Sequence, residues 1–291
     1  MISSWARVCP ATQIAQMYEM SDNTVRSYDK EVLKAKLPPP NYDQIRALLI
    51  DEKAVRKGHN YVTIVLDADT GEMLYMAEGK KKEVIDAFFE KLTVEQRKNI
   101  EAVGIDRAGA CQRSIAEYLP HAGIVYDRFH LMMNMNQSVD QVRRMEWRNA
   151  SKQDRKVIKG SCFLTLANPE NLDLKGAEKL QSLLKINENL SIAYQLKEQF
   201  KAIFAYKYTA CAIKSLEQWA EIASQSGLEP FKRLSRSLMR QKERVCGFIK
   251  YRITSGKIEG FNNQVSRVVH MACGIKDLDY LELKLRQLSV M

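Results

Sequence analysis

Runs of apolar residues of strand length constrain the fold of this chain more than any other feature. IRALLID (45–51), YVTIVLD (61–67) and EMLYMAE (72–78) have the length and composition of strands, and DADTG between the last two predicts a hairpin turn. Two further strand-like runs, 100–106 and 123–127, alternate with amphipathic helical patterns. A three-strand meander followed by strands that alternate with helices predicts an α/β fold, in which helices flank a mixed sheet.

The domain boundaries follow from a break in the sequence and from a change of pattern. LPPPN cannot continue a helix, so we place a linker at 37–43. From about residue 129 to 253 there are almost no strand signals, and apolar residues recur at helical intervals. We therefore predict a sheet domain over 44–291 that carries a large all-helical insertion at about 137–253.

The pattern of residues 1–36 predicts two short helices joined by a turn. Ser21 or Asp22 would cap the second helix, and apolar residues on both helices have the spacing of a helix-turn-helix core. The outward residues of that second helix, which would then face DNA, are Thr24, Arg26 and Ser27. An ordinary helical hairpin fits the same pattern equally well.

The net charge and the scattered cysteines limit the kinds of partner and metal site. Lys and Arg number 45 against 35 Asp and Glu, and the net charge of +10 favours a polyanionic partner such as nucleic acid. The six cysteines contain no C-x-x-C pair and the four histidines form no metal-binding pattern, so any metal would be held by oxygen. Neither a bilayer-spanning run nor a signal peptide is found, so we expect a cytoplasmic protein without a membrane partner.

Three carboxylates stand where oxygen ligands could gather. Asp51 and Asp106 end the first and fourth strands, which can be neighbours in a sheet of this order. Glu259 lies in a predicted helix, on the flank of an apolar stripe that would pack on the sheet. Gly260 beside it weakens the helix, which suggests that something approaches closely there. The competing interpretation is that both aspartates are turn residues and that Glu259 is an ordinary first-turn residue.

The motif YDRFH follows the fifth strand and contains a second acidic group. We interpret its Asp127 and His130 as supporting residues close to the carboxylates, although a capped helix start would show the same pattern. Glu52 would point to the opposite face of its strand from Asp51, so we leave it outside the site.

Basic residues form three blocks that could contact DNA phosphates. Each block could instead be a solvated helix face. The candidates are Lys53, Arg56 and Lys57 after the first aspartate, Arg143, Arg144 and Arg148 in the helical region, and Lys232, Arg236 and Arg240 further along.

Several segments taken together resemble the DDE-type transposases of the ISL-three family of bacterial insertion sequences. They are LLIDEKAVRKGHNYVTIVLDADTG, AVGIDRAGACQRSIAEYLPHAGIVYDRFHLMMNMNQSVDQVRR, SGKIEGFNNQVSRVV and ACGIKDLDYLELKLRQL. The likeness covers roughly residues 10–288, and its most specific part is YDRFH followed much later by IEGFNN.

The resemblance implies a fold, a site and a reaction. The fold is an RNase H-like core, and the catalytic, metal-binding triad falls on Asp51, Asp106 and Glu259, with Asn262 and Asn263 as supporting residues. Such enzymes use Mg²⁺ or Mn²⁺ to cleave DNA strands and join them to new DNA. The implied partners are double-stranded DNA, as terminal inverted repeats and target, and further copies of the chain in a homo-oligomer. The family's N-terminal zinc-binding segment is one part that we expect this chain to lack.

Two other functions compete with this one. An inactive or truncated copy could act only as a DNA-binding regulator through the helix-turn-helix. A tyrosine recombinase could use Tyr280 as its nucleophile, but it needs an H-x-x-R element, and His270 is followed three residues later by Cys273.

Overall fold

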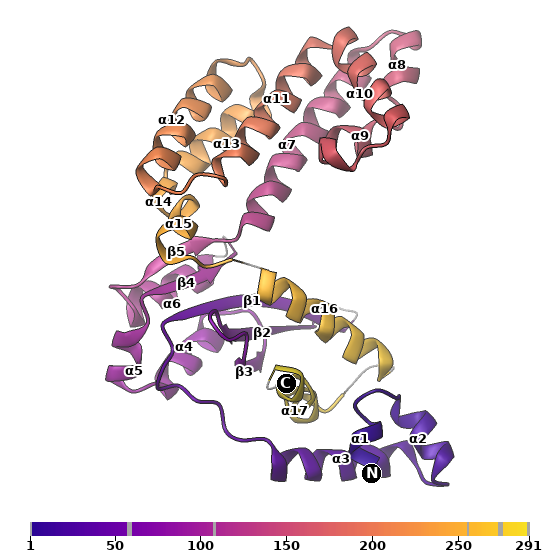
Figure 1. The fold of residues 1–291 in the computed structure, drawn as a ribbon, viewed down its shortest axis with the longest axis vertical. Helices are drawn as coiled ribbons and strands as arrows, with labels where there is room; N and C mark the ends of the chain where they lie inside the picture. Colours follow the sequence, from indigo (N-terminus) through magenta and orange to yellow (C-terminus); the bar gives the residue numbers. More distant parts are fainter. Residues whose placement is uncertain (1, 57–59, 107–108, 255, 273–275, 290–291) are drawn as a thin grey trace. The chain divides into compact units, whose positions relative to one another are not determined.

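The chain divides into two compact units, which are shown with their helices and strands in Figure 1. The first unit comprises residues 1–125 and 253–291, and the second comprises residues 126–252. The computed structural model describes residues 2–56, 60–106, 109–254, 256–272 and 276–289. Within those residues, no helix is both long and apolar enough to cross a membrane.

A five-stranded mixed sheet forms the centre of the first unit, with the strand order β3-β2-β1-β4-β5. The meander β1–β2–β3 is antiparallel, and β4 pairs in parallel with β1 on its other side. The predicted α/β class and the adjacency of the first and fourth strands are both confirmed. The strands are β1 (Ala47–Arg56), β2 (Asn60–Asp67), β3 (Met73–Glu78), β4 (Ala102–Ile105) and β5 (Gly123–Tyr126).

The central strands β1 and β4 are buried along their paired length, which explains their unbroken apolar runs. Gly104 is needed in β4 because a Cβ there would lie 2.7 Å from Leu49 Cδ2 and 3.1 Å from Ile253 Cγ2. The predicted hairpin turn is also present: Gly71, with a φ of 83°, donates its N–H to the carbonyl oxygen of Asp67 at 2.8 Å. Glycine at these two positions therefore allows close strand packing and a tight turn.

Helices from two parts of the chain pack around the sheet. Three lie between the strands in sequence, namely α4 (Lys82–Lys91), α5 (Val94–Asn99) and α6 (Gly109–Tyr118). Two more follow the helical insertion: α16 (Gly256–Met271) packs against β1, and α17 (Leu278–Ser289) packs against β3. Phe88 and Phe89 bury the apolar face of α4 and contact the rings of Tyr75 and Tyr118.

Three helices begin the first unit: α1 (Ile2–Trp5), α2 (Ala11–Met17) and α3 (Asp22–Lys36). Ile14 and Val25 are fully buried between α2 and α3, as the predicted helix-turn-helix core requires. The predicted cap is also present, because the Ser21 hydroxyl accepts a hydrogen bond from the N–H of Thr24 at 3.1 Å.

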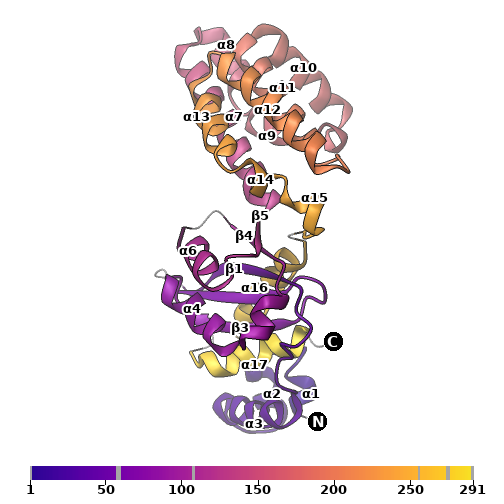
Figure 2. The same cartoon turned by 90° about the vertical axis from the view of Figure 1, so that its left-hand side faces the viewer.

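The second unit is helical from Arg128 to Tyr251 throughout its regular elements (Figure 2). Trp219 is a central core residue, since its buried indole N–H donates to the carbonyl oxygen of Leu196 at 2.8 Å. The elements are α7 (Arg128–Asn149), α8 (Lys152–Ile158), α9 (Cys162–Leu166), η1 (Pro169–Asn171), α10 (Leu174–Ile186), α11 (Glu188–Ile203), α12 (Thr209–Gln225), α13 (Glu229–Met239), α14 (Lys242–Val245) and α15 (Gly247–Tyr251).

Candidate active site

Two aspartates lie at matching positions on neighbouring parallel strands. The register of β1 and β4 pairs Ile50 with Ile105, so Asp51 and Asp106 occupy the next position on each chain. Residues in register on adjacent strands point to the same face, and neighbouring strands are about 5 Å apart. Both aspartates are partly buried. The sheet therefore presents two carboxylates together where β4 ends.

Helix α16 contributes a third polar side chain to the same place. The side-chain amide of Asn262 donates a hydrogen bond to Asp51 Oδ2 at 2.6 Å. Asp51 Oδ1 accepts the backbone N–H of Glu52 at 2.8 Å, so the orientation of this carboxylate is fixed from both sides. Asn262 Oδ1 is buried and has no hydrogen-bond partner among the residues that the structure describes. A buried acceptor without a donor is costly, and a bound cation would compensate for it.

Glu259 lies one turn before Asn262, at a spacing that places both on one side of α16. It is exposed, and within the described residues no three His, Cys, Asp or Glu side chains gather closely enough to hold a metal ion. A Cβ added at Gly260 would meet no described atom within 4 Å. The expectation of a close approach at this glycine is therefore wrong, because α16 turns that position away from the protein.

Glu52 adds negative charge near the two aspartates, which sequence reasoning did not anticipate. Burial raises the pKa of its carboxyl, the Lys80 ammonium opposes this, and the charges of Asp51 and Asp106 raise the pKa further. Glu52 follows Asp51 directly in β1, but strand alternation alone could not reveal that its carboxylate lies within electrostatic range of both aspartates. Mutual repulsion among these carboxylates favours the binding of a cation.

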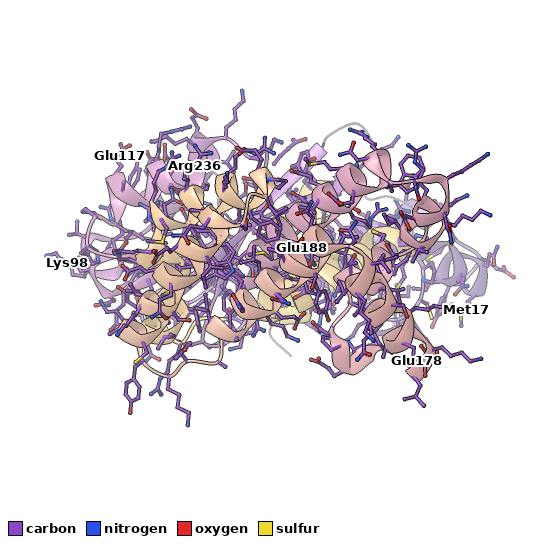
Figure 3. All side chains as sticks on the ribbon, turned by 90° about the horizontal axis from the view of Figure 1, so that it is seen from above. Met17, Lys98, Glu117, Glu178, Glu188 and Arg236 are labelled. Atoms are coloured by element: carbon purple, nitrogen blue, oxygen red, sulfur yellow. The ribbon has the colours of Figure 1, made fainter. Side chains whose placement is uncertain are left out.

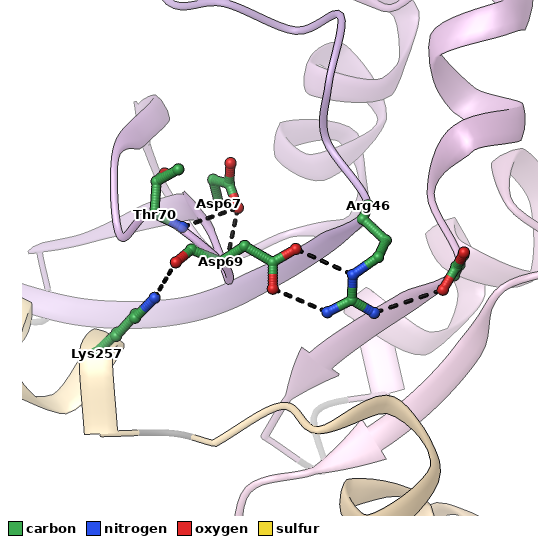
Figure 4. A network of polar contacts seen from close by, with 6 residues as sticks. Arg46, Asp67, Asp69, Thr70 and Lys257 are labelled. Carbon is green, nitrogen blue, oxygen red and sulfur yellow. Dashed lines mark hydrogen bonds and ion pairs between the residues drawn. The ribbon is translucent and has the colours of Figure 1, made fainter.

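A polar network fixes the start of α16 on the sheet (Figure 4). Arg46, just before β1, makes two hydrogen bonds to the Asp69 carboxylate, at 2.8 and 3.0 Å, and a third to Glu101 at 3.4 Å. Lys257 in the first turn of α16 donates to the carbonyl oxygen of Asp69. Because Lys257 is only two residues before Glu259, the hairpin between β2 and β3 positions the turn that carries this glutamate.

Asp127 and His130 form a pair at the start of α7 in the second unit. Asp127 is the helix N-cap, and its carboxylate accepts both the N–H of Phe129 and a hydrogen bond from His130 Nδ1, each at 2.8 Å. The alternative interpretation, a capped helix start, thus describes the local structure. A supporting role in catalysis stays a prediction.

The outward face of α3 differs in one respect from the expectation. Thr24 and Ser27 are exposed. Arg26 turns inward instead, donating to the carbonyl oxygen of Ala272 at 3.2 Å and lying 3.6 Å from Asp22. The reason is the packing of α3 near the end of α16, which the local sequence of α3 does not encode.

The three basic blocks differ in exposure. Arg143 and Arg144 each lie 2.6 Å from the Asp140 carboxylate, which offsets part of their charge. Arg148, Arg236 and Arg240 are exposed, and Arg236 is labelled at the surface in Figure 3. Lys53 and Lys232 are partly buried. Lys57 lies outside the described residues, and Arg56 is placed only as the last residue of β1.

Tyr280 is poorly placed to act as the nucleophile of a recombinase. Tyr280 is 6% exposed, and its hydroxyl donates to the carboxylate of Asp29 at 2.7 Å. Burial and the Asp29 carboxylate raise the pKa of the phenol far above its ordinary value. This environment opposes formation of the phenolate that would attack DNA.

Comparison with known proteins identifies the family. A family model described as "Transposase", of the DDE type and the ISL-three family, matches residues 48–285. The transposase for insertion sequence element IS1001 of Bordetella parapertussis is 32% identical over 276 residues, covering 94% of this chain and 68% of that protein. The transposase for insertion sequence element IS1557 of Mycobacterium tuberculosis is 23% identical over 298 residues, covering 94% and 67%. The chain therefore belongs to the ISL-three family of insertion-sequence transposases.

Proposed function

We propose that this transposase cleaves DNA strands at the ends of its element and transfers them to new DNA, with Asp51, Asp106 and Glu259 as the catalytic carboxylates. The observation that carries the proposal is the arrangement at the end of β4. Two aspartates lie in register on parallel strands, and α16, which bears Glu259, is bonded to the first of them through Asn262.

The residues at this edge fit a divalent cation. The available donors are carboxylate and amide oxygens, the ligands that Mg²⁺ and Mn²⁺ prefer, and one of them is the unpartnered Oδ1 of Asn262. Asp51 and Asp106 would hold the ion from the sheet, and Glu259 would complete the set from α16. When bound, Mg²⁺ or Mn²⁺ supplies Lewis acidity for attack on a phosphodiester by water or by a DNA 3′-hydroxyl.

The chain's own residues have separable tasks in this proposal. Asn262 and the N–H of Glu52 hold the Asp51 carboxylate in one orientation. Lys257 holds the first turn of α16 against the hairpin between β2 and β3, which limits how far Glu259 can move from the sheet. Because these side chains are already oriented, less conformational entropy is lost when metal and DNA bind to the site.

DNA is the partner that this function requires. The net charge of +10, the helix-turn-helix geometry of α2 and α3, and the exposed Arg148, Arg236 and Arg240 support it. We expect the element's terminal inverted repeats to bind first and target DNA second. Joining two ends in one event also favours a homo-oligomer on DNA.

A cleavage assay separates an active transposase from a DNA-binding regulator. The full chain is mixed with duplex DNA that ends in the element's terminal inverted repeat, in Mg²⁺, in Mn²⁺ or in EDTA. We expect strand cleavage in Mg²⁺ or Mn²⁺ and none in EDTA. DNA binding without cleavage in either metal, by a sample with a cooperative unfolding transition, would favour the regulator.

A further inference from the structure

A buried polar cluster holds the N-terminal helices against the C-terminal helix. Asp29 of α3 is fully buried, and its Oδ2 accepts hydrogen bonds from the Tyr280 hydroxyl at 2.7 Å and from the Lys284 ammonium at 3.2 Å. The same ammonium donates to the carbonyl oxygen of Ala6 at 2.8 Å. Because these groups are desolvated and connect separate elements, the segment is docked on α17 and not merely tethered through the prolines.

A cavity of about 270 Å³ lies among these docked elements. Its walls come from the loop after α1, from α3, from α16 and from α17. Part of the wall is apolar, formed by Val8, Met271 and Leu288 among others. Among the described residues that line it, none has a carboxylate and four are basic: Arg7, Arg26, Arg267 and Lys284.

Two of these four cations are already engaged. Lys284 is bonded to the Asp29 carboxylate and to a backbone carbonyl, and Arg26 is bonded to the carbonyl oxygen of Ala272. Arg7 and Arg267 are exposed and form no ion pair within the described part of the chain. They come from different parts of the chain, and both line the cavity, where the described lining residues include no acidic side chain.

We propose that this cavity seats one sugar-phosphate unit of the DNA backbone, with Arg7 and Arg267 binding the phosphate. The inference rests on the proposed function, which makes DNA the anion that the chain meets. The cationic rim suits the phosphodiester, and the apolar wall suits the faces of the adjoining deoxyribose. Arg26 of α3 lines the same cavity, so a duplex contacted by the exposed Thr24 and Ser27 has its backbone nearby.

The seat would also set the position of DNA relative to the catalytic carboxylates. Arg267 lies eight residues after Glu259 on α16, which is about 12 Å along a helix axis. A phosphate held by Arg267 would therefore fix the DNA on the same rigid helix that carries a catalytic group.

The test measures binding of the full chain to a fluorescent duplex that ends in the terminal inverted repeat, in EDTA so that no cleavage occurs. Parent and the double variant Arg7→Ala/Arg267→Ala are compared between 50 and 200 mM salt. Loss of two phosphate contacts should make the affinity of the variant less dependent on salt. The ratio of parent affinity to variant affinity should therefore fall roughly tenfold between 50 and 200 mM salt. The matched control is Lys98→Ala/Arg113→Ala, two exposed cations away from the cavity.

Three outcomes would overturn the inference and one would support it. A parent-like salt slope in the Arg7/Arg267 variant would overturn it, as would an equal change in the Lys98/Arg113 control, and so would a parent that does not bind DNA. Restoration of the slope by Arg7→Lys/Arg267→Lys, with thermal unfolding near that of the parent, would support a phosphate contact. Because the measurement contains no metal, it is independent of whether the carboxylates cleave DNA.

Discussion

Asn262 is the side chain through which α16 contacts Asp51 on β1. One end of its amide is bonded to Asp51, and its Oδ1 is buried without a donor. An alanine at this position would remove the hydrogen bond to Asp51 Oδ2 and keep the one from the N–H of Glu52 to Asp51 Oδ1. The amide thus links the orientation of a carboxylate on the sheet to the placement of the helix that bears Glu259.

We predict that Asn262→Ala weakens Mn²⁺ binding roughly 10- to 100-fold, the usual effect of removing a group that orients a metal ligand. Titration followed by electron paramagnetic resonance measures the affinity without any DNA. Asn99→Ala is the control, because Asn99 is an exposed asparagine on a different helix, α5. Equal Mn²⁺ affinity in Asn262→Ala and the parent would contradict the assigned role.

Two glycines should respond in opposite directions to the same substitution. A Cβ at Gly260 meets nothing within 4 Å, so Gly260→Ala should raise the free energy of unfolding by about 1 kcal/mol through helix propensity. A Cβ at Gly104 would overlap Leu49 and Ile253, so Gly104→Ala should lower it by about 1 to 3 kcal/mol. Urea denaturation measures both. Destabilisation by Gly260→Ala would show that its surroundings are not open.

The residues of the site were only partly predictable from the sequence. Asp51 and Asp106 could be found because each follows an apolar run, and the parallel register of β1 and β4 puts them at matching positions. The prediction that Asp51 ends its strand is wrong, because β1 continues to Arg56. The bond from Asn262 to Asp51 and the inward turn of Arg26 could not be found. Each joins residues more than 200 positions apart, and only the docking of α16 brings them together.

At the level of elements, the contact between α3 and α17 depends on a buried ion pair. Lys284 is the cation for Asp29, whose carboxylate is fully buried. Lys284→Met should cost about 3 to 5 kcal/mol of unfolding free energy, because it leaves that charge uncompensated. Combining it with Asp29→Asn should recover much of the loss, since the remaining groups are neutral. Chemical denaturation of the parent, the two single variants and the double variant tests this. Strictly additive losses of unfolding free energy would contradict the pairing.

The short helices α14 and α15 meet at a buried thiol whose ionisation should affect stability. Burial, with a smaller contribution from Glu243, raises the pKa of Cys246 from 9.0 to about 11. The folded-state pKa exceeds the unfolded value, so this stabilisation is complete below pH 9 and is lost as the pH rises through 11.

Between pH 8 and 10.5 the parent should therefore lose about 2 kcal/mol more unfolding free energy than Cys246→Ala. Urea denaturation at both pH values provides the comparison. Cys211→Ala, at an exposed cysteine, should behave like the parent. An equal loss in Cys246→Ala and the parent would show that this thiol does not contribute.

At the scale of the whole molecule, the sequence predicts the arrangement of strands and helices more completely than it predicts contacts between side chains. The order of apolar runs indicated a mixed sheet, and the helical periodicity from about residue 129 onward indicated the helical unit. Both patterns are periodic over many residues, so no single contact decides them. The docking of the N-terminal helices on α17 depends on three buried polar residues, Asp29, Tyr280 and Lys284. Their positions in the sequence follow no periodic pattern from which this contact could be predicted.

The similarity to a known transposase covers both units of the chain. The IS1001 transposase aligns over 94% of this sequence, so both the sheet unit and the helical unit have counterparts in a transposase. We propose that three carboxylates, from β1, from the end of β4 and from α16, cleave DNA.

The most direct test is metal-dependent cleavage of terminal inverted repeat DNA by Asp51→Asn, Asp106→Asn and Glu259→Gln. Glu95→Gln and Glu117→Gln remove exposed carboxylates elsewhere in the first unit and serve as controls. We predict that each of the first three abolishes cleavage while DNA binding persists, and that both controls cleave like the parent. Parent-like cleavage by any of the three site variants would contradict the proposed triad.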